Sequence, residues 1–481
     1  MTTNNKNFSV EFKLERIKHW NQVAINSDQW KSCGSYYHHY LEKIYGYLIP
    51  ESKSILEIGC GTGDLLASLN PSYGVGIDFS PEMVKRAKKK HPNLEILEMD
   101  ALDLSINEKF DYIILSDLLN DIWDVQSLFE QIKSLCSPKT RIIINSYSHL
   151  WELPLKITNA LGLSKARLQQ NWLTKEDIEN LLEITNFDVI RSTSEILFPL
   201  NIPLLSHIAN RYLAKIFPFS LFALTNIIIV KDLINEPATY KEESVSVIVP
   251  ARNEAGNIQN IIDQIPEMGS TTEIIFVEGG SKDNTYETIQ AAIKNNPDLN
   301  LSLYKQSGKG KGDAVRLGFN KANGDILMIL DADLTVPAED LPRFYKVINS
   351  GKAEFVNGVR LVYPMQKRAM RFLNLIGNKF FSIAFSWLLG QPIKDTLCGT
   401  KVIHKYDYEQ ISKNREYFGD FDPFGDFDLI FGAAKLNLKI VDLPIRYRER
   451  IYGDTNISRW KHGLLLLRMV IFAAKKIKFF G

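Results

Sequence analysis

The stretch Asp325–Asp333 reads DILMILDAD and joins a short apolar run to two acids, Asp331 and Asp333. A short apolar run bounded by polar residues predicts a buried β-strand. Three similar runs lie upstream, SVSVIVPAR, TEIIFVEGG and LNLSLYKQ, and helical stretches such as NIQNIIDQI and DAVRLGFNKA lie between the strands. Strands that alternate with helices predict a parallel sheet covered by helices on both faces.

A second series of the same kind occupies the first half of the chain. Its apolar runs are SILEIG, GVGID, LEILEMD, FDYIILS and TRIIINS. A chain of 481 residues is too long for one ordinary core, so two α/β domains are expected. The polar stretch KDLINEPATYKEES predicts the boundary. We expect a first domain at 1–235, a linker at 236–243 and a second domain at 244–481.

Charge and cysteine content argue against several classes of protein. The 57 basic and 56 acidic residues give a formal charge of +1, which argues against a protein that coats nucleic acid. The four cysteines form no CxxC pair, so they fit neither a disulfide framework nor a zinc site. They are Cys33, Cys60, Cys136 and Cys398. We therefore expect a reducing, cytoplasmic location.

Neither an export signal nor a transmembrane helix is expected. The first residues, MTTNNKNFSVEFKLERIKHW, are polar and lack the apolar core of a signal peptide. The longest apolar stretches are interrupted by charges such as Lys379 and Arg468 before they reach the roughly 20 residues that a span needs.

A glycine-rich loop follows the first strand of the first domain. The stretch Leu56–Leu65, LEIGCGTGDL, places glycines at 59, 61 and 63. Glycine is required where a ligand approaches the backbone closely. A dinucleotide fingerprint needs its third glycine at the position that Asp64 occupies, which favours a ligand other than NAD. The alternative for such a loop alone is a tight strand-to-helix connection.

Acids end the next strands in register with this loop. Asp78 ends GVGIDFS, where a carboxylate can accept both hydroxyls of a ribose, and Asp100 lies in EMDALDL. Over about the first 235 residues the chain resembles class I S-adenosylmethionine-dependent methyltransferases, which have a Rossmann-like seven-stranded sheet. The resemblance implies the following cofactor contacts: Glu57, Gly59, Gly61 and Gly63 around the methionine part, Asp78 on the ribose, Asp100 on the adenine, and Ser116 with Asp117 facing the methyl donor.

The methyl acceptor is poorly encoded, because an activated sulfonium donor needs alignment more than acid–base help. Candidates for a catalytic base are Tyr36, Tyr37, His38 and His149. Structural packing is the alternative for each of them. The segment 201–220 interrupts the last expected hairpin and either covers the acceptor site or only packs.

The two acids of the DAD stretch suit a different chemistry. Transfer of a sugar from a nucleotide-sugar releases a diphosphate, whose charge a metal ion can neutralise. Asp331 and Asp333 can address one divalent cation, and a bound cation would remove their mutual repulsion. The alternative is a pair of solvated turn acids before the helix near Ala338.

Four motifs in order support the metal interpretation: VPARNEAGNI, VEGGSKDNT, GKGKGDAVRLGF and DAD. From Ser244 onward the chain resembles family 2 inverting glycosyltransferases with a GT-A mixed sheet, of the dolichyl-phosphate mannose synthase type. The resemblance implies Mg²⁺ or Mn²⁺ at Asp331 and Asp333. It also implies a nucleoside pocket of Pro250, Glu254 and Glu278, and donor contacts by Lys311, Gly312 and Asp313. The Glu278-Gly279 pair departs from the usual Asp-Asp.

Later segments resemble the acceptor side of polyprenyl-phosphate glycosyltransferases. Arg360, Arg368 and Arg371 are expected to meet a phosphate, because guanidinium presents a planar fork to its oxygens. The helix at 370–389 is either interfacial or a core element, and the C-terminal helix either docks on an anionic membrane or packs on the sheet. RERIYGDTNISRWKHG resembles the segment that closes over the donor diphosphate, with Arg450 and Gly453 matching and Thr455 and Asn456 departing.

Asp426 and Asp428, in GDFDLIF, occupy the place where related enzymes hold a general base. Only a hydroxyl acceptor needs a base, because a phosphate is already ionised. These acids therefore leave lipid phosphate and sugar hydroxyl both open.

The sequence predicts a bifunctional enzyme. Its partners would be a nucleotide-sugar, a polyprenyl phosphate or glycan acceptor, and S-adenosylmethionine, with peripheral contact at the inner face of the plasma membrane and no nucleic acid. Two alternatives remain: a glycosyltransferase fused to a non-catalytic S-adenosylmethionine-binding domain, and a membrane-associated scaffold that only binds nucleotides.

Overall fold

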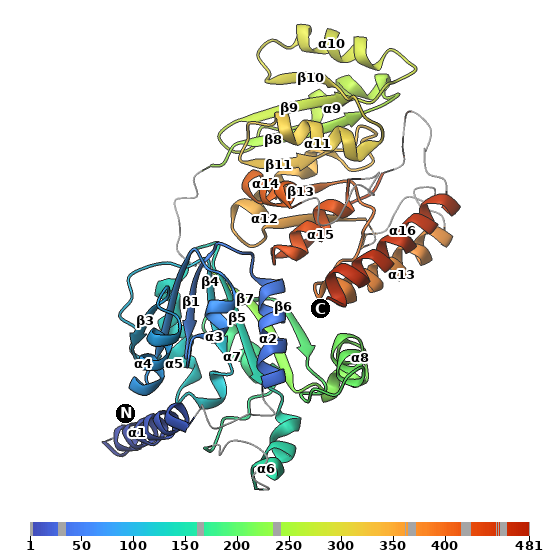
Figure 1. Ribbon diagram of the computed structural model, residues 1–481. Coiled ribbons are helices and arrows are strands. Elements are labelled where there is room, and N and C mark those ends of the chain that lie inside the picture. Colours follow the sequence, from blue (N-terminus) through green and yellow to red (C-terminus); the bar gives the residue numbers. More distant parts are fainter. Residues whose placement is uncertain are drawn as a thin grey trace. The chain divides into compact units, whose positions relative to one another are not determined.

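The computed structural model divides the chain into two compact units, Met1–Ile234 with Phe479–Gly481, and Asn235–Lys478 (Figure 1). The structure describes residues 3–26, 35–160, 168–233, 242–360, 362–363, 372–414, 425–448, 450, 452 and 459–480. Most of the predicted linker, 236–243, lies outside these ranges, as do Cys33, Arg368 and Arg371.

Unit 1 contains a seven-stranded sheet of order β3-β2-β1-β4-β5-β7-β6. All neighbours are parallel except β7, which is antiparallel to both β5 and β6. The strands are β1 Ser54–Ile58, β2 Tyr73–Asp78, β3 Glu95–Glu98, β4 Tyr112–Ser116, β5 Arg141–Tyr147, β6 Phe187–Glu195 and β7 Thr225–Asp232.

Helices cover both faces of this sheet. One buried cluster joins Phe129 and Leu182 of the helices α5 and α7 to one face, and another joins Leu41 of α2 and Ala87 of α4 to the opposite face. Local sequence fixes α4, because Ser80 Oγ accepts a hydrogen bond from Met83 N (3.2 Å) and Pro81 begins the helix. The helices are α1 Thr3–Asn26, α2 Ser35–Leu48, α3 Asp64–Ser68, α4 Pro81–Lys90, α5 Val125–Ile132, α6 Glu152–Ala160, α7 Lys175–Ile184 and α8 Leu205–Arg211, with short 3₁₀ turns η2 Leu119–Asp121, η3 Lys133–Leu135, η4 His149–Trp151, η5 Leu213–Lys215 and η6 Phe219–Phe222.

Unit 2 contains a second seven-stranded sheet, of order β10-β9-β8-β11-β13-β12-β14. It is mixed, because β13 is antiparallel to β11 and β12 while the other pairs are parallel. The strands are β8 Val245–Ala251, β9 Thr272–Glu278, β10 Leu301–Lys305, β11 Ile326–Ile329, β12 Phe355–Val359, β13 Lys401–His404 and β14 Ile440–Pro444. The prediction of two α/β domains, the second with a mixed sheet, is confirmed.

Two buried clusters cover the faces of the second sheet. Ile258 of α9 and Phe344 of α12 belong to one cluster, and Phe319 of α11, Phe385 of α13 and Phe431 of α15 belong to the other. The helices are α9 Ile258–Gln264, α10 Thr285–Asn295, α11 Lys311–Lys321, α12 Leu341–Asn349, α13 Phe372–Leu389, α14 Lys405–Lys413, α15 Phe427–Lys435 and α16 Arg459–Ala473, with η7 Ala255–Asn257, η8 Ala338–Asp340 and the π-helix η10 Ala474–Lys478. Among the described residues, no helix combines the length and apolarity needed to cross a membrane.

Candidate active sites

The first candidate site lies at the carboxyl ends of β8, β9 and β11 in unit 2. Ala251 pairs in register with Glu278, and Ile329 pairs with Ile248. The loops after these parallel strands therefore begin at one edge of the sheet, which is where α/β sheets commonly bind ligands.

Asp331, just beyond β11, pairs with the first residue of α11. Lys311 Nζ lies 2.6 Å from Asp331 Oδ1, and both side chains are about a quarter exposed. Burial opposes the charged form of each group, but their attraction is stronger. The pKa of Asp331 is therefore lowered and that of Lys311 is raised. Arg360 and Lys401 also favour the Asp331 carboxylate, and Asp426 favours the Lys311 cation.

Gly399 lies directly against this ion pair. A Cβ at residue 399 would lie 1.9 Å from Asp331 Oδ2 and 2.4 Å from Lys311 Nζ. A side chain therefore cannot be added there unless the pair or the loop before β13 moves. The loop and the Asp331–Lys311 pair form one packed unit.

Asp333 pairs with a residue from far along the chain. Arg450 Nη2 lies 2.5 Å from Asp333 Oδ2, and Arg450 Nη1 lies 3.5 Å from Glu254 Oε1. Thr335 donates from both its backbone N (3.1 Å) and Oγ1 (2.7 Å) to Asp333 Oδ1. Burial raises the pKa of Glu254 to about 6, with Arg450 and Asn257 acting in the opposite direction.

The repulsion expected between the two acids is thus offset within the chain. Asp331 has Lys311 and Asp333 has Arg450. Each carboxylate therefore faces a cation of the chain itself, beside the place where a bound metal ion is predicted.

The loops after β8 and β9 are bonded to each other. Asn253 N donates to Ser281 Oγ (3.0 Å), and Asn253 Oδ1 accepts from Lys282 N (2.7 Å). Glu278 is buried and accepts a hydrogen bond from Ser281 N (2.5 Å) at Oε1. The predicted nucleoside residues Pro250, Glu254 and Glu278 therefore lie at or just after adjacent strand ends.

The first turn of α11 is closely surrounded. Asp313 Oδ2 accepts from Gly308 N (3.0 Å), and a Cβ on Gly308 would lie 2.5 Å from the Asp313 carboxylate. A Cβ on Gly425 would lie 2.6 Å from Gly312 Cα. The predicted donor residues Lys311, Gly312 and Asp313 are thus held in place by glycines on both sides.

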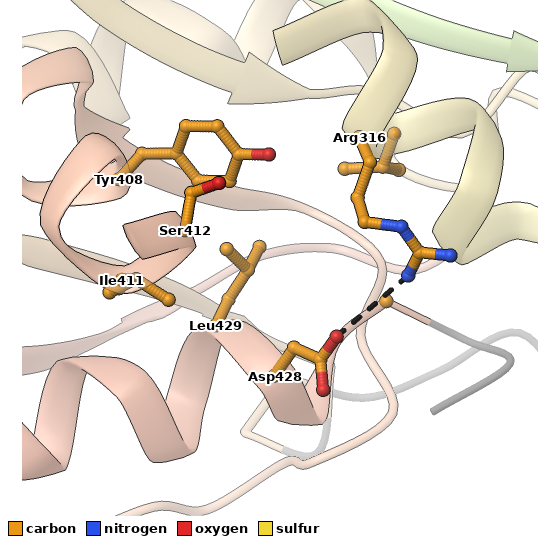
Figure 2. A pocket seen from close by; sticks show the side chains of 8 residues that line it. Arg316, Tyr408, Ile411, Ser412, Asp428 and Leu429 are labelled. Atoms are coloured by element: carbon orange, nitrogen blue, oxygen red, sulfur yellow. Dashed lines mark ion pairs between the residues drawn. The ribbon is translucent and has the colours of Figure 1, made fainter. Parts of the chain in front are cut away.

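Asp426 and Asp428 both lie beside cations. Asp426 Oδ1 is 3.8 Å from Nζ of the fully buried Lys401. Asp428 Oδ2 is 3.8 Å from Arg316 Nη1, and Figure 2 shows this pair beside a small cavity of about 30 Å³. That volume holds about one or two water molecules, so the cavity is too small for a sugar.

Arg360 makes a different contact from the one predicted. Its Nε and Nη2 donate to Asp395 at 2.7 and 2.8 Å, and Asp395 is fully buried. This bidentate pair uses the planar fork of the Arg360 guanidinium inside the protein. Arg371, Gly453, Thr455 and Asn456 lie outside the described residues.

Sequence reasoning missed three residues in the segment DTLCGTK. Asp395 holds Arg360, Gly399 lies on the Asp331–Lys311 pair, and Lys401 approaches Asp426. The signal in the sequence was a short segment that combines two charged residues with a glycine, a pattern that can indicate buried ion pairs and close backbone packing.

The second candidate site lies at the carboxyl ends of β1 and β2 in unit 1. Gly59, Gly61 and Gly63 have φ of +76°, +53° and +76°, a region that favours glycine. Asp78 accepts from Gly61 N at Oδ2 and from Ser80 N at Oδ1, both at 2.9 Å. Burial raises the pKa of Asp78, and these backbone donors oppose that rise. Asp78, the last residue of β2, therefore holds the glycine loop in place.

Helix α1 contacts the acids of this site. Lys13 Nζ lies 2.6 Å from Asp100 Oδ2, and Ser80 Oγ donates to Asn21 Oδ1 (2.7 Å). Arg16 Nε lies 2.9 Å from Asp121 Oδ1. The helix thus lies along the carboxyl ends of β2, β3 and β4.

Asp117, which follows β4, lies at the centre of a polar cluster. Tyr37 Oη donates to Asp117 Oδ1 (2.9 Å), Asn145 Nδ2 donates to the same oxygen (2.6 Å), and Tyr147 Oη donates to Oδ2 (3.3 Å). Burial, followed by the charge of Asp117, raises the pKa of Tyr37. Tyr37 therefore stays a protonated donor. We call Asp117, Tyr37, Asn145 and Tyr147 the Asp117 cluster.

The other candidate bases lie in different surroundings. Tyr36 Oη accepts from Asn210 Nδ2 (3.3 Å), and His38 packs edge-on against Tyr37. The exposed His149 lies 3.2 Å from Trp172 O through Nδ1. Of the four candidates, Tyr37 is the one that the structure brings to Asp117.

Glu57 is buried and accepts from Leu66 N at Oε2 (3.1 Å). Burial raises its pKa to about 8, against about 4.3 in an unfolded chain. Between these values the folded state holds a proton that the unfolded state releases, so stability falls as pH rises. We expect Glu57→Gln to reduce the slope of unfolding free energy against pH by up to about 1.4 kcal/mol per pH unit. The free energy of unfolding is measured at several pH values by urea denaturation, with hydrogen exchange of β1 peptides as the probe of unit 1. Equal slopes in the two proteins would show that Glu57 is ionised in the fold.

Comparison with known proteins agrees with this division. Glycosyl transferase family 2 matches residues 246–411, and a methyltransferase domain matches residues 49–187. Glycosyltransferase AglJ of Haloferax volcanii is 27% identical over 235 residues, covering 48% of this chain and 73% of that protein. The undecaprenyl-phosphate 4-deoxy-4-formamido-L-arabinose transferase of Yersinia pestis is 32% identical over 233 residues, 47% of this chain and 64% of that protein.

Two solved structures have weaker similarity. Glucosyl-3-phosphoglycerate synthase from Mycobacterium tuberculosis has a TM-score of 0.36 at 18% identity, covering 49% of this chain and 80% of its own. The PH0226 protein of Pyrococcus horikoshii has a TM-score of 0.31 at 17% identity, covering 41% of this chain and 91% of its own. The sequence matches place each family on one unit. The chain therefore carries a methyltransferase domain followed by a family 2 glycosyltransferase domain.

Proposed function

We propose that the chain is a bifunctional enzyme of lipid-linked sugar synthesis. Unit 2 transfers a sugar from a nucleotide-sugar to a polyprenyl phosphate, and unit 1 transfers a methyl group from S-adenosylmethionine to a related substrate. The observation that carries this proposal is the group of Asp331, Asp333, Lys311 and Arg450 at one strand edge.

This arrangement suits a nucleoside diphosphate. Lys311, at the N-terminal end of α11, and Arg450 both present positive charge at the edge where the loops begin. A diphosphate leaving group gains negative charge as the glycosidic bond breaks, and fixed cations stabilise that charge. Pro250, Glu254 and Glu278 are proposed to hold the nucleoside beside it.

The two acids fit a divalent cation together with the donor. In the described ranges no three acid, histidine or cysteine side chains form a ready-made metal site. Mg²⁺ needs only one or two protein carboxylates when substrate phosphates supply other ligands. Asp333 Oδ2 already faces a positive group, Arg450. Asp331 and Asp333 would hold Mg²⁺ or Mn²⁺ when the donor is bound. The metal ion would neutralise the charge of the leaving diphosphate.

A phosphate acceptor is favoured over a hydroxyl acceptor. The Yersinia pestis relative is named as a transferase to undecaprenyl phosphate. Asp426 and Asp428, the candidate bases for a hydroxyl acceptor, each lie 3.8 Å from a cation of the chain, Lys401 and Arg316 respectively. A phosphate needs no general base.

Two helices of unit 2 offer a surface for peripheral membrane contact. Phe380, Ile383 and Trp387 on α13 are exposed at 3- and 4-residue spacing. Leu464, Leu467 and Ile471 on α16 are exposed with the same spacing. Figure 1 shows α13 and α16 side by side, and lysines follow them at 475, 476 and 478. Apolar stripes with basic flanks are typical of interfacial helices.

One face of α13 packs in the core, and the exposed face is the one proposed to contact the membrane. Phe385, Leu388 and Leu389 of the same helix are buried in the core.

The described cysteines are free and buried, which supports a reducing compartment. We therefore place the enzyme at the cytoplasmic face of the membrane.

The donor site can be tested with purified chain, Mn²⁺, undecaprenyl phosphate and a panel of UDP- and GDP-sugars. We expect lipid glycosylation, detected by mass, to be lost in Asp333→Asn and on metal chelation, because the diphosphate charge is then not neutralised. Asp340→Asn, which removes a partly exposed carboxylate paired with Arg343, is the matched control. Release of free nucleotide without any change of lipid mass would instead indicate a hydroxyl acceptor.

Gly399→Ala tests the contact with the ion pair. The added Cβ cannot lie 1.9 Å from Asp331 Oδ2, so Asp331 or the loop must move. We expect sugar transfer to fall more than about tenfold, since small misplacements of reacting groups have large effects. Gly377→Ala, where a Cβ meets nothing within 4 Å, should retain activity, with thermal melting as the check on folding. Normal turnover in Gly399→Ala would contradict a role for this packing.

Asp78→Ala tests the methyltransferase half and separates it from a non-catalytic module. The variant loses the acceptor for Gly61 N and Ser80 N and the proposed ribose contact. Charged hydrogen bonds contribute about 1.5–3 kcal/mol, so S-adenosylmethionine should bind about tenfold to a hundredfold more weakly in calorimetry. Asp103→Ala, at an exposed acid nearby, is the control. If the unaltered chain does not bind S-adenosylmethionine, the methyltransferase proposal fails.

A further inference from the structure

Unit 1 carries a long insertion between two paired strands. β6 and β7 are antiparallel neighbours, and such strands are usually joined by two to five residues. Here residues 196–224 lie between them and form α8, η5 and η6. The segment is therefore much longer than a hairpin connection requires.

The insertion exposes many large apolar side chains. Phe217 is 76% exposed and Leu204 is 73% exposed, and Leu221 and Phe222 are more than half exposed. The segment 150–157 adds Leu153, which is 70% exposed. The two segments meet where Trp151 Nε1 donates to Phe222 O (2.9 Å). We call the exposed side chains of residues 200–222 and 150–157 the apolar surface.

The charges around the apolar surface indicate what it contacts. Residues 196–224 include no aspartate or glutamate. Of their basic residues, His207 is exposed and Arg211 is partly exposed, whereas Lys215 is buried and paired with Glu195 (3.1 Å). The acid of the other segment, Glu152, is paired with Lys156 (2.7 Å). Large exposed apolar patches mark interaction sites, and a patch with basic but no acidic residues in its main segment is complementary to anionic lipid.

The apolar surface is joined to the Asp117 cluster. Ser148 N donates to Leu224 O (2.7 Å), directly after Tyr147 and directly before Thr225. Tyr147 Oη donates to Asp117, and Thr225 Oγ1 lies 3.1 Å from Tyr37 Oη. The exposed segments therefore lead into the polar group that follows β4.

We propose that the apolar surface docks unit 1 on a lipid surface containing anionic phospholipid. Docking there places the Asp117 cluster near the boundary between water and lipid, which suits a methyl acceptor carried by a lipid. The acceptor part rests on the proposed methyltransferase function, whereas the docking part does not.

Hydrogen exchange of the full chain with vesicles tests the docking. The vesicles contain phosphatidylcholine, with or without phosphatidylglycerol. We expect slower exchange in peptides covering 200–222 and 150–157 with the anionic vesicles. Leu153→Glu/Leu221→Glu should lose this protection but keep that of α13 and α16. Ile184→Glu, at an apolar residue of α7 that is 55% exposed, is the control and should keep both.

Three results would distinguish the possibilities. Protection of α13 and α16 alone would overturn the proposal, and so would protection that appears without vesicles and grows with protein concentration, because a second copy would then cover the surface. S-adenosylmethionine binding is measured in the same variants. If the apolar surface is protected while no S-adenosylmethionine binds, the docking is supported and the methyltransferase function fails separately.

Discussion

The Asp331–Lys311 ion pair connects the parts of the glycosyltransferase unit. Asp331 follows β11, Lys311 begins α11, and Gly399 closes over both from the loop before β13. Removing one member of a partly buried pair leaves the other charge without its partner, which is costly. The pair therefore fixes where a central strand, a covering helix and the loop before an antiparallel strand meet, and the proposed donor residues lie at that meeting point.

The methyltransferase unit holds its strand-end acids in a comparable way. Asp78 is held by two backbone N–H groups, Asp100 by Lys13, and Asp117 by a tyrosine and an amide. Apart from Ser80, which follows Asp78 by two residues, each partner comes from a different part of the fold. Such preorganised groups need little rearrangement when a ligand arrives, which is the main way that positioned polar groups accelerate a reaction.

Local sequence was sufficient for β1 to β5, for β8 to β11, for the glycine loop and for the acids that follow these strands, whereas β12, β13 and β14 were missed. Apolar runs and glycines are local signals, so SILEIG became β1 and DILMIL became β11. The partners of the acids could not be predicted in the same way. Arg450 reaches Asp333 across 117 residues, and Arg360, which was predicted to meet a phosphate, pairs with Asp395. These pairings depend on how distant elements pack, and no local pattern encodes that.

The exposed apolar residues of both units have a common physical consequence. Water-facing side chains such as Phe217 in unit 1 and Ile383 in unit 2 contribute nothing to their own cores, so their burial requires another surface. If both units use one membrane, a product made at the lipid surface stays within reach of the second activity. Confinement to a shared surface raises effective concentration in the way that a tether does. A membrane would thus couple two chemistries whose active-site residues are entirely separate in sequence.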